Sequence, residues 1–320
     1  MIQKTYDSNY TLFEEITVDT NTTKLYTRQT IHYLYQKEII SSTSKYPTYE
    51  PSEFLIESNK RFTYYSLPKY SNLKDLFDSY SYIVFVKSSI SSFEQRVMIR
   101  SIYSNSTLNT KFYFLVGLSM NTNLNHQLTD EQRQYNDMII PNIYDIYQNL
   151  TLKVFLGMDL LLLSKVRTTL ILVDDDICIN MNLLIQNLNH CDLSNNDLYA
   201  GRLFLARPSK YLMSKHSIPY LIDHEVFSFV HGPCIVLSTF SIQKMMLIHS
   251  RLYYIMHADD IELGELAKQS FIDICSIPSI FIDYNELKKK NQTLKQSQHI
   301  MTHYIKTPNE LYSICYDMKM

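Results

Sequence analysis

Three consecutive aspartates, Asp174, Asp175 and Asp176, follow the apolar run at residues 169–173. Adjacent carboxylates repel one another, and burying them costs free energy unless a cation or hydrogen-bond donors compensate. Their oxygen atoms suit a hard divalent cation such as Mn²⁺ or Mg²⁺. Side chains alternate along an extended exit from a strand, so Asp174 and Asp176 would share a side. The alternative is a solvated acidic turn without a ligand.

A second acidic pair, Asp259 and Asp260, lies much later in the chain. Two carboxylates hold Mg²⁺ or Mn²⁺ through one or two direct bonds, while waters and substrate phosphates fill the other positions. The triplet therefore favours a nucleotide diphosphate substrate over an all-protein metal cage. With a metal held there, the later pair could supply a general base. The alternative for Asp259 is a cap on the helix that follows.

The segments around these residues alternate between strand and helix patterns. Short apolar runs predict buried strands at residues 82–86, 112–117, 169–173 and 198–201, and a longer apolar run covers residues 227–237. Helices are predicted at residues 93–103, 144–164, 180–188 and 238–254, with one starting at Thr129 and one entered from a loop within 257–267. This order predicts an α/β domain with a mostly parallel central sheet. Ligands of such sheets bind at the carboxyl ends of the strands, where the triplet lies.

Composition excludes several classes of function. With 320 residues, 45% of them hydrophobic and 19% charged, the chain can bury a large core. Its net charge of −2 gives no electrostatic footprint for nucleic acid. The sequence has neither a Walker motif nor G-x-G-x-x-G, and charges interrupt its longest apolar stretch, residues 154–173. No membrane span and no signal-peptide core are expected, which leaves a cytosolic protein or a chain without its targeting segment.

Cysteine, sequon and glycine usage give weaker indications. The five cysteines have no C-x-x-C spacing, and their odd number leaves at least one outside any internal disulfide. Sequons suggest a secretory chain, although chance could supply several; they start at Asn9, Asn21, Asn105, Asn149 and Asn291. Glycine is so rare that each one is expected where no other residue fits; the five are Gly117, Gly157, Gly201, Gly232 and Gly264.

Several short motifs occur in a characteristic order. They are the pair Arg96 and Arg100, F-L-V-G at 114–117, E…Y.D……D.Y.NLTLK over 131–153, the triplet, Gly201 with Lys215, H-G at 231–232, V-L-S at 236–238, and D-D-I..G at 259–264. Together they resemble the β1,3-galactosyltransferase and β1,3-N-acetylglucosaminyltransferase family (glycosyltransferase family 31), to which Fringe proteins are more distantly related. The resemblance covers about residues 80–315. Four of the five glycines fall on glycine positions of the family pattern.

The resemblance implies a GT-A fold, a Rossmann-like α/β domain that binds a UDP-sugar together with Mn²⁺ or, in its place, Mg²⁺. Residues 76–320 would form this catalytic domain, and residues 1–75 a variable stem or peripheral region. The implied reaction is an inverting, β1,3-linked transfer of galactose or N-acetylglucosamine to a glycan acceptor on a glycoprotein or glycolipid. Family members are Golgi type II membrane proteins, so we expect the Golgi lumen, although no anchor is visible in this chain.

The same resemblance implies roles for the acidic residues. Asp176 would contact the metal directly, and Asp174 and Asp175 would hold the ribose and the metal-bound waters. Asp260 would be the catalytic base that deprotonates the acceptor hydroxyl, which then attacks the anomeric carbon opposite the leaving UDP. A single displacement of this kind requires no enzyme nucleophile, which agrees with the absence of a recognisable Ser/His/Asp or Cys/His arrangement.

Other residues would complete the site. A C-terminal histidine often joins the metal shell in this fold, and His303 is the best candidate, with His299 as the fallback. Arg96, Arg100 and Lys153 would contact uracil or phosphate; the alternative for each is packing and ion pairing inside the domain. Asp145 and Tyr147 are expected to be structural. The acceptor side, or the pocket around it, would include Lys215, His231, Gly232 and Asp259.

The sequence also departs from the family pattern. It contains no Trp, and Tyr103, His216 and Cys315 stand where the family usually has one. The residue before Gly232 is His231 where the family usually has Ser. These departures bear on acceptor recognition more than on metal binding, and they leave a second interpretation open: a nucleotide-sugar-binding pseudoenzyme or chaperone of the same fold.

Overall fold

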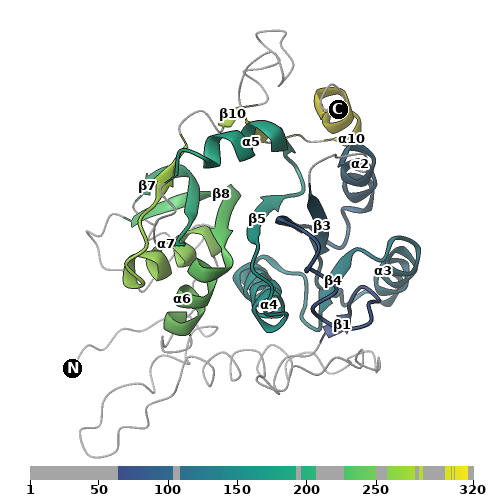
Figure 1. Cartoon of the computed structure of the whole chain (residues 1–320). Coiled ribbons are helices and arrows are strands. Elements are labelled where there is room, and N and C mark those ends of the chain that lie inside the picture. The colour runs from purple at the N-terminus through teal and green to yellow at the C-terminus, as the bar shows by residue number, and fades with distance from the viewer. Residues whose placement is uncertain are drawn as a thin grey trace, which may run out of the picture.

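The structure is a computed structural model that describes residues 64–103, 109–191, 196–206, 227–249, 258–277, 281–283, 300–303, 305 and 307–315. Within these residues, helices cover both faces of a central sheet (Figure 1). The predicted α/β class with flanking helices is therefore confirmed.

The described strands of the central sheet lie in the order β1-β4-β3-β2-β5-β8-β7-β9. Their bounds are β1 Tyr64–Ser66, β4 Met138–Pro141, β3 Thr110–Leu115, β2 Tyr82–Lys87, β5 Thr169–Asp174, β8 Phe227–Ser238, β7 Tyr199–Ala206 and β9 Cys275–Ser276. The run β4-β3-β2-β5 is parallel, as predicted, and so is the β7-β9 pair. Antiparallel pairs join β1 to β4 and join β8 to both β5 and β7, so the whole sheet is mixed.

A small second sheet adjoins the end of β5, in the order β10-β11-β6. Its bounds are β10 Phe281–Asp283, β11 Met301–His303 and β6 Cys178–Ile179. The helices are α2 Phe93–Tyr103, α3 Thr122–Tyr135, the 3₁₀ turn η3 Tyr147–Asn149, α4 Leu150–Leu163, α5 Met181–Leu188, α6 Thr239–His249, α7 Asp259–Gln269 and α10 Pro308–Cys315.

Side chains on the two faces of the sheet form two separate cores. Val84 and Val86 of β2 point into the core that α2, α3, α5 and α10 cover. Ile83 and Phe85 of the same strand point into the core that α4, α6 and α7 cover. This alternation explains why the parallel strands read as continuous apolar runs, since both of their faces are buried.

Two helix starts differ from the prediction. The helix predicted to start at Thr129 begins at Thr122, because the side chain of Asn121 accepts a hydrogen bond from Asn123 N (3.0 Å) and caps it there. The helix predicted over 144–164 begins at Leu150. The residues before it follow a different path: Tyr144 bridges to Leu118 beside the sheet, and the 3₁₀ turn η3 comes next.

Other predicted elements are confirmed with adjusted ends. The helix predicted over 93–103 has these bounds, and the one predicted over 180–188 begins at Met181 with Asn180 as its cap. The strand predicted over 198–201 continues to Ala206. The apolar run around the 231–233 interruption forms one long strand, β8, with a register shift against β7 between Gly201 and Leu203.

The boundary proposed at residue 75 stays a prediction, and residues 1–63 lie outside the described part of the chain. Tyr64–Ser66 form β1 at the edge of the central sheet, and Tyr64, Leu76 and Phe77 are buried in the core. None of the helices described here combines the length and the apolarity needed to cross a membrane.

Candidate functional site

The acidic triplet lies at the carboxyl end of β5, beside the end of β2. Asp174 is the last residue of β5, and its partner in the parallel register is Lys87. Lys87 Nζ lies 2.9 Å from Asp174 Oδ1. The parallel topology therefore places a cation beside the first carboxylate of the triplet.

Lys87 also reaches the second acidic cluster. Its ammonium lies 3.0 Å from Asp259 Oδ2 and donates to the carbonyl of Gly232 over 2.9 Å. Its side chain is 3% exposed, so this ammonium is a buried charge held by two carboxylates and a carbonyl. One side chain from β2 thus joins the end of β5, the start of α7 and the middle of β8.

The electrostatic balance keeps Lys87 charged. Burial alone would lower the pKa of this ammonium, but Asp174 and Asp259 outweigh burial and raise the pKa well above its ordinary value. Removing either partner of such a buried ion pair destabilises the fold, because the remaining charge is left uncompensated. Lys87 is therefore a fixed positive charge between the two clusters.

The second aspartate of the triplet is held by the loop that follows β2. Asp175 Oδ2 accepts hydrogen bonds from Ser88 Oγ (2.8 Å) and Ser89 N (3.3 Å). Burial raises the pKa of Asp175, whereas the hydrogen bonds from the serines oppose that rise. Ser88 Oγ in turn accepts from Arg96 Nη1 over 3.0 Å. A continuous chain of contacts therefore runs from the triplet into α2.

Arg96 and Arg100 are engaged inside the domain. Arg96 is 1% exposed and forms two hydrogen bonds with the carboxylate of Glu131, at 2.8 and 2.6 Å. Arg100 forms two with Asp137, at 2.8 and 2.9 Å, a third with Glu131, and stacks over the ring of Tyr135. These contacts match the alternative of internal ion pairing; a direct contact with a donor stays a prediction.

Lys153 is engaged in the same way, beneath the loop after β2. Its ammonium contacts Asp145 Oδ1 at 2.7 Å and donates to the carbonyl of Ser88 at 2.9 Å. Asp145 Oδ2 accepts from Ile90 N, so both residues hold the same loop. The structural role expected for Asp145 is confirmed. The predicted contact of Lys153 with a donor remains untested, and its observed effect on the triplet runs through Ser88.

Asp260 sits in the first turn of α7, where two backbone N–H groups donate to its carboxylate. Gly232 N donates to Oδ2 over 3.2 Å, and Ile261 N donates to Oδ1 over 2.9 Å. Burial and the neighbouring Asp259 raise the pKa of Asp260 to about 6, against the lowering effect of Lys87 and the two N–H groups. A carboxylate with a pKa near the working pH suits a general base.

Gly232 allows the close approach of β8 to Asp260. A Cβ atom on Gly232 would lie 3.1 Å from Asp260 Oδ2, which is closer than nine in ten real Cβ contacts. Gly264 permits the same close packing one turn further along α7, where a Cβ would lie 2.5 Å from the Cβ of Phe229. These two glycines let α7 approach β8 so that a backbone N–H can hold the carboxylate.

Asp259 has a different role from the cap considered above. The N-cap of α7 is Ala258, and Asp259 is the first helical residue, 4% exposed and paired with Lys87. The capping alternative is therefore wrong, because the side chain turns toward the buried ammonium. Its predicted part in the pocket around the acceptor is not tested by these contacts.

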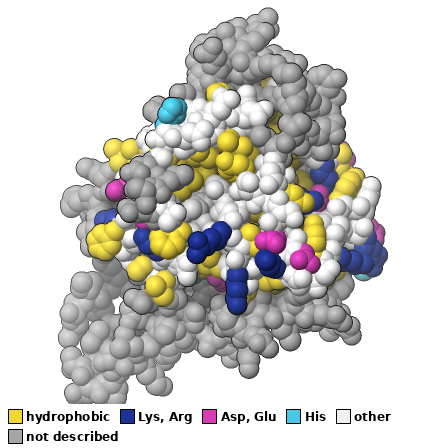
Figure 2. All heavy atoms as spheres, in the orientation of Figure 1, with side chains coloured by type: hydrophobic (Ala, Val, Ile, Leu, Met, Phe, Trp, Pro, Cys, Tyr) yellow, Lys and Arg dark blue, Asp and Glu magenta, His cyan; other side chains and the backbone are white. Residues whose placement is uncertain are grey.

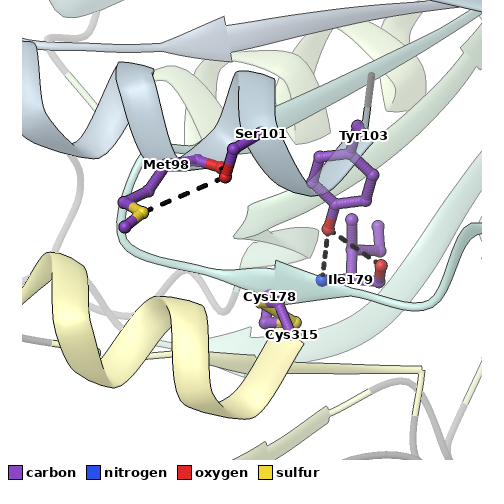
Figure 3. Close-up of a disulfide and its surroundings, with 6 residues drawn as sticks. All are labelled: Met98, Ser101, Tyr103, Cys178, Ile179 and Cys315. Carbon is purple, nitrogen blue, oxygen red and sulfur yellow. Dashed lines mark hydrogen bonds between the residues drawn. A yellow bond between two sulfur atoms is a disulfide. The ribbon is translucent and has the colours of Figure 1, made fainter. Parts of the chain in front are cut away.

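The strand that follows the triplet is fixed from two sides (Figure 3). Cys178 of β6 forms a disulfide with Cys315 of α10. From the other side, the Tyr103 hydroxyl of α2 accepts from Ile179 N (3.0 Å) and donates to Ile179 O (2.9 Å). Tyr103 and Cys315 are two of the residues at which the resemblance led us to expect Trp, and both contact the strand that follows the triplet.

The remaining cysteines follow the expectation from their odd number. Cys191 and Cys275 form a second disulfide, and Cys234 is a free, buried thiol in β8. One sequon lies inside the described fold: Asn149 is 2% exposed, and its side-chain amide donates to the carbonyl of Tyr144 over 2.9 Å. That sequon therefore gives no support to a glycosylated surface.

The remaining predicted residues fall in different places. The backbone of His303 lies in β11, beside β6, where Thr302 pairs with Cys178 and Ile305 N donates to the carbonyl of Asp176 over 3.2 Å. Its role as a metal ligand stays a prediction. The rings of His231 and Phe204 stack with centroids 5.2 Å apart. Lys215, His216 and His299 lie outside the described residues.

Sequence reasoning missed Lys87 and Ser88, which hold the triplet. Lys87 is the last residue of β2, one position beyond the strand predicted over 82–86, and Ser88 follows it. The available signal was a charge at the carboxyl end of a buried strand, where ligands of parallel sheets gather. The three partners of Lys87 are Asp174, Gly232 and Asp259, and all lie far away in the chain, the last two by 145 and 172 residues, so no local pattern points to them.

The donor atoms at the triplet fit a hard cation only in part. They are carboxylate oxygens, the type that Mn²⁺ and Mg²⁺ prefer. In the described part of the chain, no three His, Cys, Asp or Glu side chains converge as a metal cage. The residues present therefore fit an ion that takes one or two carboxylates and draws its other ligands from phosphate and water.

The profile of the galactosyltransferase family matches residues 94–278, more than half of the chain. The chain belongs to this family. The match includes both acidic clusters, Arg96, Lys153 and Gly232. Family membership and the layered α/β architecture agree with the predicted GT-A fold.

Named relatives are consistent with this assignment. Beta-1,3-galactosyltransferase 2 of Mus musculus is 27% identical over 240 residues, which cover 72% of this chain and 56% of that protein. Lactosylceramide 1,3-N-acetyl-beta-D-glucosaminyltransferase B of Danio rerio is 30% identical over 210 residues, 58% of this chain and 53% of that protein. The matches thus span little more than half the length of either relative.

Among solved structures, the galactosyltransferase LgtC in complex with donor and acceptor sugar analogues aligns with 75% of this chain and 96% of its own. The sequence identity is 8% and the TM-score 0.38. A likeness of this size supports no statement about the reaction or its substrates.

Proposed function

We propose that this protein transfers galactose or N-acetylglucosamine from a UDP-sugar to a glycan acceptor, with inversion at the anomeric carbon and a β1,3 linkage. The observation that carries the proposal is the set of contacts made by Lys87. Its ammonium contacts Asp174 of the triplet and also Asp259 and the carbonyl of Gly232, which adjoin Asp260. This juxtaposition supplies a donor side and an acceptor side to one reaction centre. Family membership supports a hexosyltransferase activity.

On the donor side, the triplet would bind the metal and the ribose. Asp174 and Asp176 would hold Mn²⁺ or Mg²⁺, with His303 joining them, and Asp175 would serve the ribose. Once bound, the ion supplies positive charge that neutralises the leaving diphosphate. Arg96 and Lys153 would act as positioning residues, because their contacts fix the backbone and hydroxyl of Ser88, which holds Asp175.

On the acceptor side, Asp260 would act as the general base. Its carboxylate takes the proton from the acceptor hydroxyl, and the oxygen forms the new bond to the anomeric carbon. The bond between that carbon and the diphosphate oxygen breaks at the same time, and UDP leaves with the electron pair. Two backbone N–H groups hold the carboxylate in place, so its direction is set by β8 and α7.

The two disulfides support an oxidising compartment as the site of action, since such bonds persist in the secretory pathway and are rare in the cytosol. We propose the Golgi lumen, in keeping with the family. Figure 2 shows Lys and Arg side chains interspersed with acidic and hydrophobic ones on the face it presents. That mixture offers no single-sign surface there for a polyanionic partner.

The test uses the full chain with Mn²⁺ and a panel of UDP-sugars, with methyl β-glycosides of galactose and N-acetylglucosamine as acceptors. We expect UDP release that rises when the right acceptor is added, and a β1,3 linkage in the product. Asp176→Asn should abolish metal-dependent binding of UDP, whereas Asp130→Asn, on the exposed face of α3, should leave it unchanged. If the protein binds UDP but releases none from any UDP-sugar, the transferase proposal is wrong and the pseudoenzyme alternative takes its place.

A further inference from the structure

Three aromatic rings form a ladder across β7 and β8. Phe204 is paired with Phe229 in the register of the two strands, with ring centroids 5.8 Å apart and tilted by 47°. Phe204 also stacks on His231, with centroids 5.2 Å apart and an interplanar angle of 19°. Phe229 is 4% exposed, whereas Phe204 is 38% exposed. The three rings therefore extend from the interior, at Phe229, to an exposed ring, Phe204.

The third ring, His231, lies next to the residue whose N–H holds the proposed base. His231 immediately precedes Gly232, whose N–H donates to Asp260 Oδ2. The inner ring, Phe229, contacts α7 at Gly264, one turn after Asp260. Both ends of the ladder are thus fixed to the same helix that presents the carboxylate.

The exposed apolar surface on this side of β7 is that of Phe204, which is 38% exposed. Its neighbours Leu203 and Leu205 are 41% and 65% exposed, but side chains alternate along a strand, so both lie on the opposite side of β7. Buried Phe229 and the stacked imidazole of His231 restrict the rotation of the Phe204 ring, so the surface is pre-organised.

We propose that Phe204 and His231 form an aromatic platform that binds one face of the acceptor sugar ring. A pyranose carries C–H groups on its faces and hydroxyls around its rim, so it can stack on a flat ring and keep its hydroxyls free for hydrogen bonds. The acceptor fits better than the donor, because the accepting hydroxyl must reach Asp260. This inference rests on the proposed transferase function.

Substitution of Phe204 tests the platform in the UDP-release assay. Aromatic stacking contributes about 0.5–1.5 kcal/mol, which corresponds to about a two- to tenfold change in binding. Phe204→Ala should therefore raise the acceptor KM by about that factor, with the donor KM and the rate of donor hydrolysis in the absence of acceptor unchanged. Phe204→Tyr keeps the flat ring and should retain the wild-type acceptor KM.

Leu205→Ala is the matched control, since Leu205 is the next residue on β7, more exposed, and on the opposite side of the strand. It should leave the acceptor KM unchanged. His231→Ala, from the other strand, should raise the acceptor KM as Phe204→Ala does and serves as the second variant if Phe204→Ala folds poorly. An unchanged acceptor KM in either correctly folded variant would overturn the platform. Failure of the wild type to release UDP would instead overturn the transferase function.

Discussion

The two acidic clusters contain the same residue type in different surroundings. The carboxylates of the triplet meet side chains: Lys87 at Asp174 and Ser88 at Asp175. Asp260 meets backbone N–H groups in the first turn of α7, and burial with a neighbouring carboxylate raises its pKa to about 6. Three adjacent carboxylates suit a metal ion and its diphosphate, whereas a carboxylate with a pKa of about 6 suits proton transfer.

Lys87 makes these two clusters into one site. Its ammonium pairs with Asp174 on one side and Asp259 on the other, and its carbonyl partner Gly232 is also the backbone donor to Asp260. Lys87 therefore belongs to neither cluster but contacts both, and it holds their different surroundings in place. Substitutions can separate the two halves of the site and then test the link between them.

The largest effect is expected when the base alone is removed. Asp260→Asn should lower the transfer rate about 10²- to 10⁴-fold, the usual contribution of general base catalysis, and leave UDP binding with Mn²⁺ unchanged. The measurement is initial-rate kinetics together with calorimetric binding of UDP. Asp159→Asn is a matched control, because burial raises the pKa of Asp159 to about 6 as well, but Asp159 lies in α4 and its electrostatic neighbour is Tyr64 of β1. Loss of UDP binding in Asp260→Asn would mean that donor binding and proton transfer are not separated between the two clusters.

Removal of the link should destabilise the fold. Lys87→Met leaves Asp259 buried without its cation, and breaking such a pair costs about 3–5 kcal/mol of unfolding free energy. Urea unfolding followed by circular dichroism measures the loss, since the chain has no Trp. Lys244→Met is the control: Lys244 pairs with Asp197 at 2.8 Å but is 38% exposed, so about 0–1 kcal/mol is expected. If both variants lose the same free energy of unfolding, Lys87 does not link the two clusters.

The raised pKa of Asp260 predicts how the transfer rate depends on pH. The base must be unprotonated, so the rate should be level above about pH 7 and fall through a midpoint near pH 6. Well below the midpoint, each further pH unit should cost about tenfold, since one pKa unit corresponds to a tenfold change in the protonated fraction. The pH profile of kcat/KM gives the midpoint. A midpoint near pH 4 would show that the carboxylate is not held in this environment in solution.

The sequence predicted the parts of the site that lie close together in the chain. The parallel strands and the positions of the two acidic clusters follow from local patterns of apolar and acidic residues, whereas the role of Asp260 came from the family resemblance and stays a prediction. Lys87 could not be predicted in the same way, because its role depends on three partners that only the sheet and α7 bring to it. Arg96 was recognised, but its partner Glu131 was expected near the start of a helix that in fact begins at Thr122.

The smallest and most specific effect is expected from Gly232→Ala. The added methyl group would lie 3.1 Å from Asp260 Oδ2, so the carboxylate or β8 must move by a few tenths of an ångström. A displacement of about 1 Å can cost about 10²-fold in rate, so a loss of up to about tenfold is expected here. The hydrogen bond from Gly232 N lowers the pKa of Asp260, and weakening it should move the midpoint of the pH profile upward.

Gly157→Ala is the control for crowding alone. A Cβ on Gly157 would also lie 3.1 Å from its nearest neighbours, but these are Leu115 and Phe85 in the core beneath α4. That variant should change the stability of the fold and leave the pH midpoint unchanged. An upward shift in Gly232→Ala alone would show that the contact between β8 and α7 sets the basicity of Asp260. A shift of the same size in both variants would assign the effect to general loosening of the fold.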